Sequence, residues 1–341
     1  MKAILLAGGE GKRLKAVTGP LPKPLVPLLG RPLAEHILRL LRRNGVSRVC
    51  AALKYRPELL MEALGDGSAL GLRLEYRIVE KDAGTAGAVK NCADFIGGED
   101  VLVISGDAAC DLDLRELFRR HRESGAAVTM ALHRDANPLR YGLAVTDGED
   151  AVRAFVEKPD WGRVVTDLVN TGIYVLSPRA LEPVPTDRPF DFARDLFPLL
   201  LKKGELLLGV PLAGYWCDVG TPLSYYRCCA DALEGRLKLE PGGAFAAAPE
   251  KAPEKEEEES TAALDFPCRD RAALMGTLSR WMLELPADYS DGIRLSNPRF
   301  ELHIRPEEDR SALRIAVNAP DAEFARRLAF SARDLAAALE G

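Results

Sequence analysis

Histidine is scarce in this sequence, long apolar runs are absent, and the cysteines form no paired motif. Four histidines among 341 residues argue against a histidine-based metal centre. No apolar run approaches the roughly 18–20 residues of a membrane helix, so we expect no membrane association. The chain starts directly with an apolar strand pattern, and we therefore expect no signal peptide.

The seven cysteines are odd in number and lack any C-x-x-C spacing. This pattern predicts reduced, mostly buried thiols in a cytoplasmic protein rather than a disulfide framework or a zinc site. A net charge of −5 gives no support for nucleic-acid binding through phosphates. The length predicts one large α/β domain and one small additional unit.

The most informative stretch lies at the start of the chain. Residues 2–7 have the pattern of a buried parallel strand, which ends at Gly8-Gly9. Glycines leave backbone N–H groups uncovered, which is how a protein cradles a polyphosphate. Arg13 and Lys23 then add two cations of the kind needed where negative charge develops on a phosphorus under attack.

Taken alone, a glycine-rich turn is as consistent with simple turn formation as with phosphate binding. The spacing is neither GxxxxGK[ST] nor GxGxxG followed by an acid. The longer string, LAGGxGxRL followed by PKPLxPxxGRP, is far more specific. It resembles the signature of the sugar-1-phosphate nucleotidylyltransferases, of the mannose-1-phosphate guanylyltransferase type. Enzymes of that family join a sugar 1-phosphate to a nucleoside triphosphate and release pyrophosphate. The resemblance covers residues 1–235.

This resemblance implies which residues bind the nucleotide: Leu6, Ala7, Gly8, Gly9, Gly11, Lys12, Arg13, Lys23, Gly84 and Thr85. Gly84 and Thr85 belong to the stretch GTAGA, whose backbone faces the nucleobase in the family. A helix start with small packing residues is the alternative reading. Lys12 departs from the family, which commonly has threonine there, and it either adds a phosphate contact or crowds the loop.

Alternating strand and helix patterns follow the glycine-rich turn. Helices are expected at 33–44 and 57–64, and strands at 48–53 and 72–79. This order predicts an α/β fold with a Rossmann-like, mostly parallel sheet and helices on both faces. In such sheets, ligands bind at the carboxyl ends of the strands.

Two aspartates are candidate metal ligands. A strand pattern from residue 101 delivers Asp107 to the sheet edge, where a carboxylate is costly unless it is paired or bound to metal. Turn capping is the alternative for Asp107, and Asp111 and Asp113 are expected to cap the helix at 114–124. By resemblance, Asp107 and Asp218, the latter in W-x-D-x-G-T-P, hold Mg²⁺ with phosphate oxygens. Arg13, Lys23 and Asp107 are the expected catalytic residues.

A third group of residues is expected to bind the sugar 1-phosphate. By resemblance, the backbone around Gly142 lines the sugar pocket and Asn170 is aimed at the sugar, although an ordinary strand residue is the alternative for Asn170. Glu157 and Lys158 follow a strand. The family uses such a pair for the sugar hydroxyls and the phosphate respectively, whereas a solvated surface pair is the alternative.

The composition changes abruptly after residue 239. Residues 1–239 are expected to form the nucleotidyltransferase domain, and 240–263, rich in Pro, Ala and Glu, a disordered acidic linker. Residues 264–341 predict a small α+β domain with helices at 270–283 and 321–339 and strands at 292–295, 299–304 and 313–317. This part resembles the C-terminal domain of the phosphohexomutases. Glu307, Glu308 and Asp309 replace its phosphate loop and would repel a sugar phosphate, so no mutase activity is expected.

The sequence thus predicts a cytoplasmic enzyme that transfers a nucleoside monophosphate from an NTP to a sugar 1-phosphate, with Mg²⁺ as cofactor. GTP and mannose 1-phosphate are the preferred pair, because of the mutase-like domain and the GTAGA segment. A heptose-1-phosphate guanylyltransferase and enzymes with UDP- or CDP-linked products stay open. So do homo-oligomer formation and a non-catalytic role in binding a nucleotide sugar and regulating a partner enzyme. No nucleic-acid partner is expected.

Overall fold

The computed structural model describes residues 1–9, 21–79, 82–135, 138–158, 164–242, 260–267, 287–288, 293–297, 300–306 and 312–340. The chain divides into two compact units. Met1–Gly9 with Ile37–Trp216 forms the first unit, and Glu10–His36 with Cys217–Gly341 forms the second. The chain passes from one unit to the other inside α2 (Leu33–Arg43) and inside β13 (Trp216–Asp218).

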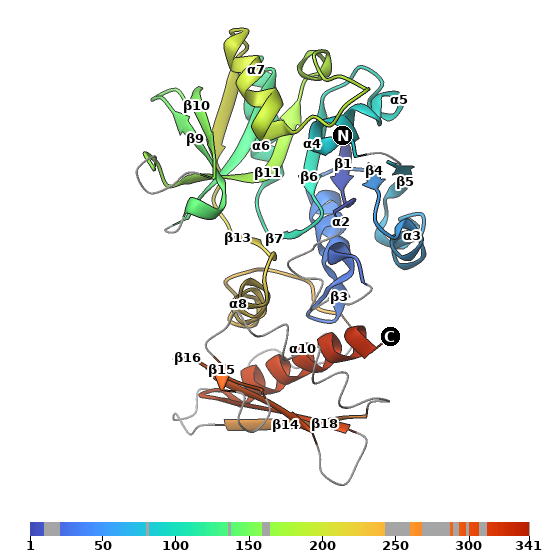
Figure 1. The fold of residues 1–341 in the computed structure, drawn as a ribbon, viewed down its shortest axis with the longest axis vertical. Coiled ribbons are helices and arrows are strands. Elements are labelled where there is room, and N and C mark those ends of the chain that lie inside the picture. Colours follow the sequence, from blue (N-terminus) through green and yellow to red (C-terminus); the bar gives the residue numbers. More distant parts are fainter. Residues whose placement is uncertain are drawn as a thin grey trace. The chain divides into compact units, whose positions relative to one another are not determined.

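The first unit is built on a nine-stranded sheet in which β10, β9, β11, β6, β1, β4 and β5 are neighbours in that order (Figure 1). Two further strands complete it, since β8 pairs with both β11 and β12. The strand bounds are β1 (Lys2–Leu6), β4 (Arg48–Leu53), β5 (Arg73–Ile78), β6 (Val101–Ser105), β8 (Val128–Arg134), β9 (Gly142–Thr146), β10 (Val152–Glu157), β11 (Leu168–Leu176) and β12 (Leu207–Pro211).

The strands β5, β4, β1 and β6 pair in parallel, as the order of the sequence patterns predicts. Ala3, Ile4 and Leu5 of β1 are fully buried, because a parallel strand inside an α/β sheet is covered on both faces. The antiparallel part begins at β11, which pairs with β6 in the opposite direction. The predicted α/β fold with a mainly parallel central sheet is confirmed.

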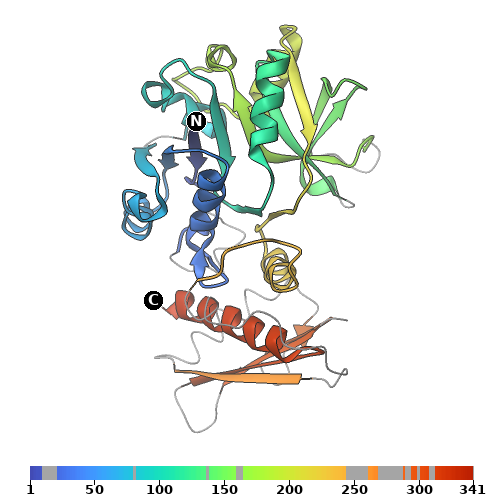
Figure 2. The ribbon, with the colours of Figure 1, turned by 180° about the vertical axis from the view of Figure 1, so that it is seen from behind.

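Helices and short turns connect these strands. Their bounds are α3 (Pro57–Leu64), η2 (Ser68–Leu70), α4 (Gly84–Lys90), α5 (Ala93–Ile96), α6 (Leu114–Ser124), η3 (Pro138–Arg140), η5 (Pro178–Leu181), the π-helix η6 (Phe192–Leu196) and α7 (Phe197–Lys202). The short strand β7 (Ala108–Cys110) lies between β6 and α6. Helix α6 packs against β8 and β12, as Figure 2 shows. Asp113 caps α6, as expected, by accepting a hydrogen bond from the Arg115 N–H at 3.1 Å. Asp111 does not cap it and accepts from the Tyr215 N–H at 2.7 Å.

The second unit contains an antiparallel five-stranded sheet covered by one long helix. The strands run in the order β14 (Ser260–Pro267), β18 (Ala312–Ala319), β17 (Phe300–Pro306), β16 (Ile293–Asn297) and β15 (Ala287–Asp288). The helix α10 (Ala322–Glu340) packs on β14 and β18, and it also contacts α8 (Pro222–Leu233) and β2 (Pro27–Leu28). The remaining elements are η1 (Lys23–Leu25) and β3 (Arg31–Pro32).

The boundaries expected at residues 239 and 263 differ from the structure. The Gly242 N–H donates to Leu29 O at 3.0 Å, so the chain is still bound to the folded part beyond residue 239. The strand β14 begins at Ser260, inside the expected linker, and pairs with β18 along its whole length. Contacts of α10 with α8 and β2 assign residues 10–36 and 217–239 to the unit that holds the C-terminal sheet. The expected helix at 270–283 and residues 243–259 lie outside the described residues.

The cysteines of the described chain are all free thiols. Five of them are buried and Cys217 is partly exposed, as expected for a protein without a disulfide framework, while Cys268 lies outside the described part. Within the described ranges, no helix combines the length and the apolar character that crossing a membrane requires.

A buried histidine joins α6 to the sheet. His121 is 2% exposed, and its two ring nitrogens lie 2.8 Å from Thr129 Oγ1 and 3.1 Å from Ser177 Oγ. Burial lowers the pKa of His121 below its usual value, although the Asp100 carboxylate, 3.8 Å away, opposes this shift. The folded protein therefore resists protonation of this imidazole more than the unfolded chain does.

We predict that the free energy of unfolding falls as the pH drops below about 6.5, by up to about 1.4 kcal/mol per pH unit from His121 alone. The unfolded chain takes up a proton in this range and the folded chain does not. Urea unfolding at several pH values between 5.5 and 7.5 measures the slope. His121→Gln should show a shallower slope, and an unchanged slope would contradict the assignment.

Candidate active site

The sheet order places the carboxyl ends of β1 and β6 side by side. Leu6, the last residue of β1, pairs with Ala52 of β4 on one side and with Ser105 of β6 on the other. The strand order reverses here, because β4 follows β1 on one side and the later strand β6 lies on the opposite side. Open α/β sheets bind ligands at such a switch point. The turns that follow β1 and β6 therefore start at the expected ligand edge.

Close packing explains the glycines in these two turns. The Gly106 N–H donates to Leu6 O at 2.8 Å, and a side-chain carbon on Gly106 would lie 2.8 Å from the same oxygen. A side-chain carbon on Gly8 would lie 3.2 Å from Lys54 Cβ, whereas Gly9 has open space around it. Of the predicted nucleotide residues, Leu6 ends β1 and Ala7 follows it, whereas Gly11, Lys12 and Arg13 lie outside the described residues.

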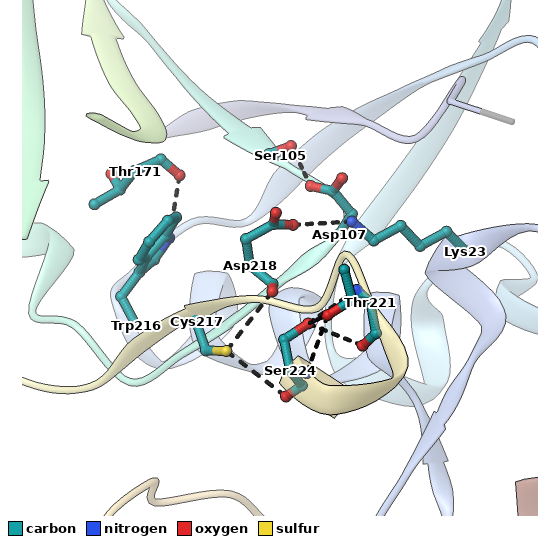
Figure 3. Close-up of polar contacts among 9 residues, drawn as sticks. All are labelled: Lys23, Ser105, Asp107, Thr171, Trp216, Cys217, Asp218, Thr221 and Ser224. Atoms are coloured by element: carbon teal, nitrogen blue, oxygen red, sulfur yellow. Dashed lines mark hydrogen bonds and ion pairs between the residues drawn. The ribbon is translucent and has the colours of Figure 1, made fainter. Parts of the chain in front are cut away.

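Asp107 follows β6 directly at this edge. The Ser105 hydroxyl donates a hydrogen bond of 2.6 Å to Asp107 Oδ1 (Figure 3). This hydrogen bond fixes the orientation of the carboxylate, whose oxygens are the ligands that a hard divalent cation prefers. The next strand, β7, starts at Ala108, so the Asp107 backbone lies between two strands. This placement fits a ligand-facing carboxylate.

In the second unit, Lys23 and Asp218 form an ion pair although they are 195 residues apart in sequence. Lys23 Nζ lies 3.0 Å from Asp218 Oδ1, and the Lys23 side chain is only 8% exposed (Figure 3). Burying an unpaired ammonium group is costly, so the carboxylate compensates the charge. The structure thus brings together a predicted phosphate-binding cation and a predicted metal ligand.

Rigid turns hold both partners of this pair. Lys23 lies in η1 between two prolines, where the Val26 N–H donates to the Lys23 carbonyl at 3.1 Å. After Asp218, a side-chain carbon on Gly220 would lie 2.7 Å from Asp218 Oδ2, so any other residue there would displace the carboxylate. Thr221 then caps α8 in a capping box with Ser224. Both side chains are therefore presented from fixed backbone.

Three predicted sugar-binding residues lie on neighbouring strands in the first unit. Gly142 of β9 is directly opposite Glu157 of β10, and a side-chain carbon on Gly142 would lie 2.8 Å from Glu157 Oε2. Val169 of β11 is opposite Leu143 of β9, so Asn170 and Gly142 come next on their strands. The glutamate carboxylate thus lies over the glycine, and the asparagine follows on the adjacent strand.

The Asn170 amide has a fixed orientation. Its Nδ2 donates to the Tyr174 hydroxyl at 2.9 Å, and its Oδ1 accepts from the Gly172 N–H at 3.1 Å. Gly172 has φ +76°, and a side-chain carbon there would lie 3.2 Å from Ser105 Cβ. Burial raises the pKa of Tyr174, so the hydroxyl keeps its proton. The strand that presents Asn170 therefore packs against the strand end that leads to Asp107.

Lys158 has an unusual backbone conformation. Its φ is +42°, in the left-handed region that side chains other than glycine rarely adopt. Its N–H donates to Tyr141 O at 3.2 Å, and its side chain is exposed. Such strained positions are concentrated at functional sites. The conformation is consistent with a cation held out beside Gly142 and Glu157.

The GTAGA segment forms the start of α4. Gly84 has φ +68°, and a side-chain carbon there would lie 2.6 Å from the Phe190 backbone. The Thr85 N–H, which was expected to face the nucleobase, donates instead to Asp191 Oδ1 at 3.1 Å. The Asp191 carboxylate therefore accepts from this amide, and the assignment of Gly84 and Thr85 to the nucleobase stays a prediction.

Some residues of this region could not be identified from sequence reasoning as site residues. Trp216 donates from Nε1 to Thr171 O at 3.1 Å (Figure 3) and meets the Tyr141 ring edge-on at 5.2 Å. It therefore holds the Tyr141–Gly142 turn beside β11. Its place two residues before Asp218 in W-x-D-x-G-T-P was the available signal. No sequence motif pointed to Asp191 as a site residue.

Comparison with known proteins gives a consistent result. The chain matches the family model described as Nucleotidyl transferase over residues 2–235. It is 37% identical over 234 residues to a mannose-1-phosphate guanylyltransferase of Mycobacterium tuberculosis, covering 68% of this chain and 65% of the relative. A UTP–glucose-1-phosphate uridylyltransferase of Synechocystis is 31% identical over 251 residues, covering 70% and 65%. The chain thus spans slightly less than two thirds of both relatives.

A solved structure extends the comparison to the fold. HddC from Yersinia pseudotuberculosis, in complex with GMP-PN, has a TM-score of 0.58 and 29% identity, covering 67% of this chain and 97% of that one. The family match ends at residue 235, before the C-terminal sheet, so the resemblance of that part to the phosphohexomutases stays a prediction. Over most of its length, the chain belongs to the nucleotidyl transferase family.

Proposed function

We propose that this protein transfers a nucleoside monophosphate from a nucleoside triphosphate to a sugar 1-phosphate, releasing pyrophosphate. One observation carries this proposal. The glycine turn expected to bind phosphate and the turn with Asp107 follow β1 and β6. The residues expected to bind the sugar lie on or directly after β11, β9 and β10, and these five strands are consecutive neighbours in one sheet. A transfer between two bound phosphates needs such an alignment, because its rate depends mainly on positioning.

In the proposed reaction, a phosphate oxygen of the sugar 1-phosphate attacks the α-phosphorus of the triphosphate in line. A new P–O bond forms as the bond to the departing pyrophosphate breaks. Lys158 would orient the attacking phosphate, and Glu157 and Asn170 the sugar hydroxyls. Arg13 and Lys23 would neutralise the charge that develops on the triphosphate. The protein forms no covalent bond to the substrate in this scheme.

Asp107 and Asp218 fit a hard divalent cation, and we propose that it is Mg²⁺. Asp107 accepts a hydrogen bond from the Ser105 hydroxyl, and Asp218 accepts one from the Lys23 ammonium group. No cluster of three or more His, Cys, Asp or Glu that could hold a metal occurs among the residues that the structure describes. Phosphate oxygens of the substrate would therefore complete the ligand set. When bound, the ion supplies charge neutralisation at the phosphates.

We propose GTP and mannose 1-phosphate as the substrate pair. The identity to a mannose-1-phosphate guanylyltransferase and the fold similarity to a protein in complex with GMP-PN support this choice. The uridylyltransferase relative supports UTP and glucose 1-phosphate as the next pair to test. A heptose 1-phosphate is a third acceptor, carried over from the sequence resemblance.

A substrate panel tests the proposed function. We expect Mg²⁺-dependent pyrophosphate release with GTP and mannose 1-phosphate, faster than with UTP and glucose 1-phosphate or with a heptose 1-phosphate. The measurement is a coupled pyrophosphate assay on the full chain, with the nucleotide sugar identified by mass. Binding of a nucleotide sugar without turnover of any pair would favour the non-catalytic alternative.

Replacement of Asp107 tests the metal assignment. Asp107→Ala should lower metal-dependent turnover at least about a hundredfold, because a ligand that holds charge at the reacting phosphates is lost. Asp113→Ala is the matched control, since it removes the α6 cap and an exposed ion pair with Arg115, and it should cost about 1 kcal/mol of stability without changing turnover. Equal turnover of the Asp107 variant and the wild type would remove Asp107 from the mechanism.

Substitution of Gly142 tests the proposed sugar pocket. Gly142→Ala should raise KM for the sugar 1-phosphate and leave KM for the triphosphate unchanged, because the added carbon would lie 2.6 Å from the Phe155 ring and 2.8 Å from Glu157 Oε2. Gly148→Ala, between the same two strands with open space around it, is the control. If both variants have wild-type KM values, Glu157 and Gly142 do not form the sugar pocket.

A further inference from the structure

A polar contact joins two segments of the first unit that are 106 residues apart. Asp191 Oδ1 accepts hydrogen bonds from the Thr85 N–H at 3.1 Å and from the Thr85 hydroxyl at 3.0 Å. The Thr85 hydroxyl oxygen in turn accepts from the Phe192 N–H at 3.0 Å. Thr85 therefore directs its amide and its hydroxyl to residues 191–192.

Backbone hydrogen bonds reinforce this contact. The N–H groups of Ala86 and Gly87 donate to Phe190 O at 2.9 and 3.1 Å, and the Phe190 N–H donates to Ala83 O at 2.8 Å. Gly84, with its positive φ, has no room for a side chain against the Phe190 backbone. The loop at residues 83–85 is thus pressed against residues 190–192, and its conformation depends on that segment.

Asp191 is itself held at the start of η6. Its N–H donates to Asp195 Oδ2 at 2.8 Å, and its carbonyl accepts from the Leu196 N–H at 2.9 Å. Isolated π-helical turns are rare in proteins and are frequent at functional sites. The backbone of Asp191 is therefore fixed independently of its contact with Thr85.

The segment at residues 190–192 also contacts β11, the strand that carries Asn170. The ring of Phe192 packs against the ring of Tyr174, with centroids 5.0 Å apart, and the Tyr174 hydroxyl accepts from Asn170. The η6 segment thus touches the GTAGA loop through Asp191, and β11 through Phe192. Only the first of these two contacts is polar and directional.

We propose that Asp191 is a positioning residue for the nucleotide, which sets the conformation of the loop at residues 83–85 and thereby its fit to the nucleobase. The inference rests on the proposed function, because that function assigns the loop to the nucleotide. Asp191 acts through Thr85, whose amide it occupies, and makes no contact with the substrate. In this proposal the Thr85 amide fixes the conformation of the loop at the nucleobase pocket and does not itself hydrogen-bond to the base.

Three variants of the full chain test this role. Asp191→Ala should raise both KM and the dissociation constant for GTP about tenfold, as expected for loss of hydrogen bonds to a charged group. KM for mannose 1-phosphate should stay unchanged. Asp191→Asn keeps the acceptor oxygen and should restore most of the GTP affinity. Asp195→Ala is the control, because it removes a hydrogen bond to the Asp191 backbone and none to Thr85. It should leave the ratio of the two KM values unchanged even if it lowers Tm.

Two results would overturn the positioning role. One is an equal rise of both KM values in Asp191→Ala, and the other is the same shift of their ratio in Asp195→Ala. If the wild type turns over no substrate pair, the proposed function fails, and calorimetric titration with GTP still decides the role of Asp191. A tenfold weaker GTP complex in Asp191→Ala would then support it, whereas equal affinity, or no GTP binding by the wild type, would overturn it.

Discussion

The contact between the ends of β1 and β6 is the constraint on which the rest of the first unit depends. The Gly106 N–H donates to Leu6 O, and no side chain fits between them. Two turns with different tasks, one rich in glycine and one carrying Asp107, therefore start from adjacent strands. Because β11 pairs with β6, the strand that carries Asn170 is added to the same sheet, followed by β9 and β10. A one-strand change in this order would separate the turn predicted to bind the nucleotide from the strands predicted to bind the sugar.

The second unit contains a largely buried cation, the side chain of Lys23. Lys23 is 8% exposed and is paired with Asp218. Lys23 lies in η1 between two prolines, and Asp218 is the last residue of β13. The Asp218 carboxylate, which is 25% exposed, compensates the charge of the more deeply buried ammonium group. The packing of α10 on α8 and β2 also makes the C-terminal sheet part of the unit that holds this pair.

Much of the fold follows from local patterns. The strand at 48–53 and the helices at 57–64 and 114–124 have the bounds that apolar periodicity, an initial proline and the Asp113 cap predict. The segment at 192–202 begins as a π-helical turn, where Asp191 and Phe192 make hydrogen bonds to Thr85 that no local pattern encodes. The strand β14 was missed because its polar and small residues alternate weakly, and its pairing with β18 decides its conformation.

The sequence by itself determined the alternation of strands and helices, the glycine turns, and which residue types could bind phosphate, metal and sugar. Those properties depend on side-chain chemistry and on spacing along the chain. Only the tertiary structure decided that Lys23 pairs with Asp218, that Glu157 lies over Gly142, and that Asp191 takes the Thr85 amide. Each of these contacts joins residues whose separation in sequence carries no periodic signal, so only the pairing of the strands and the packing of the turns can bring them together.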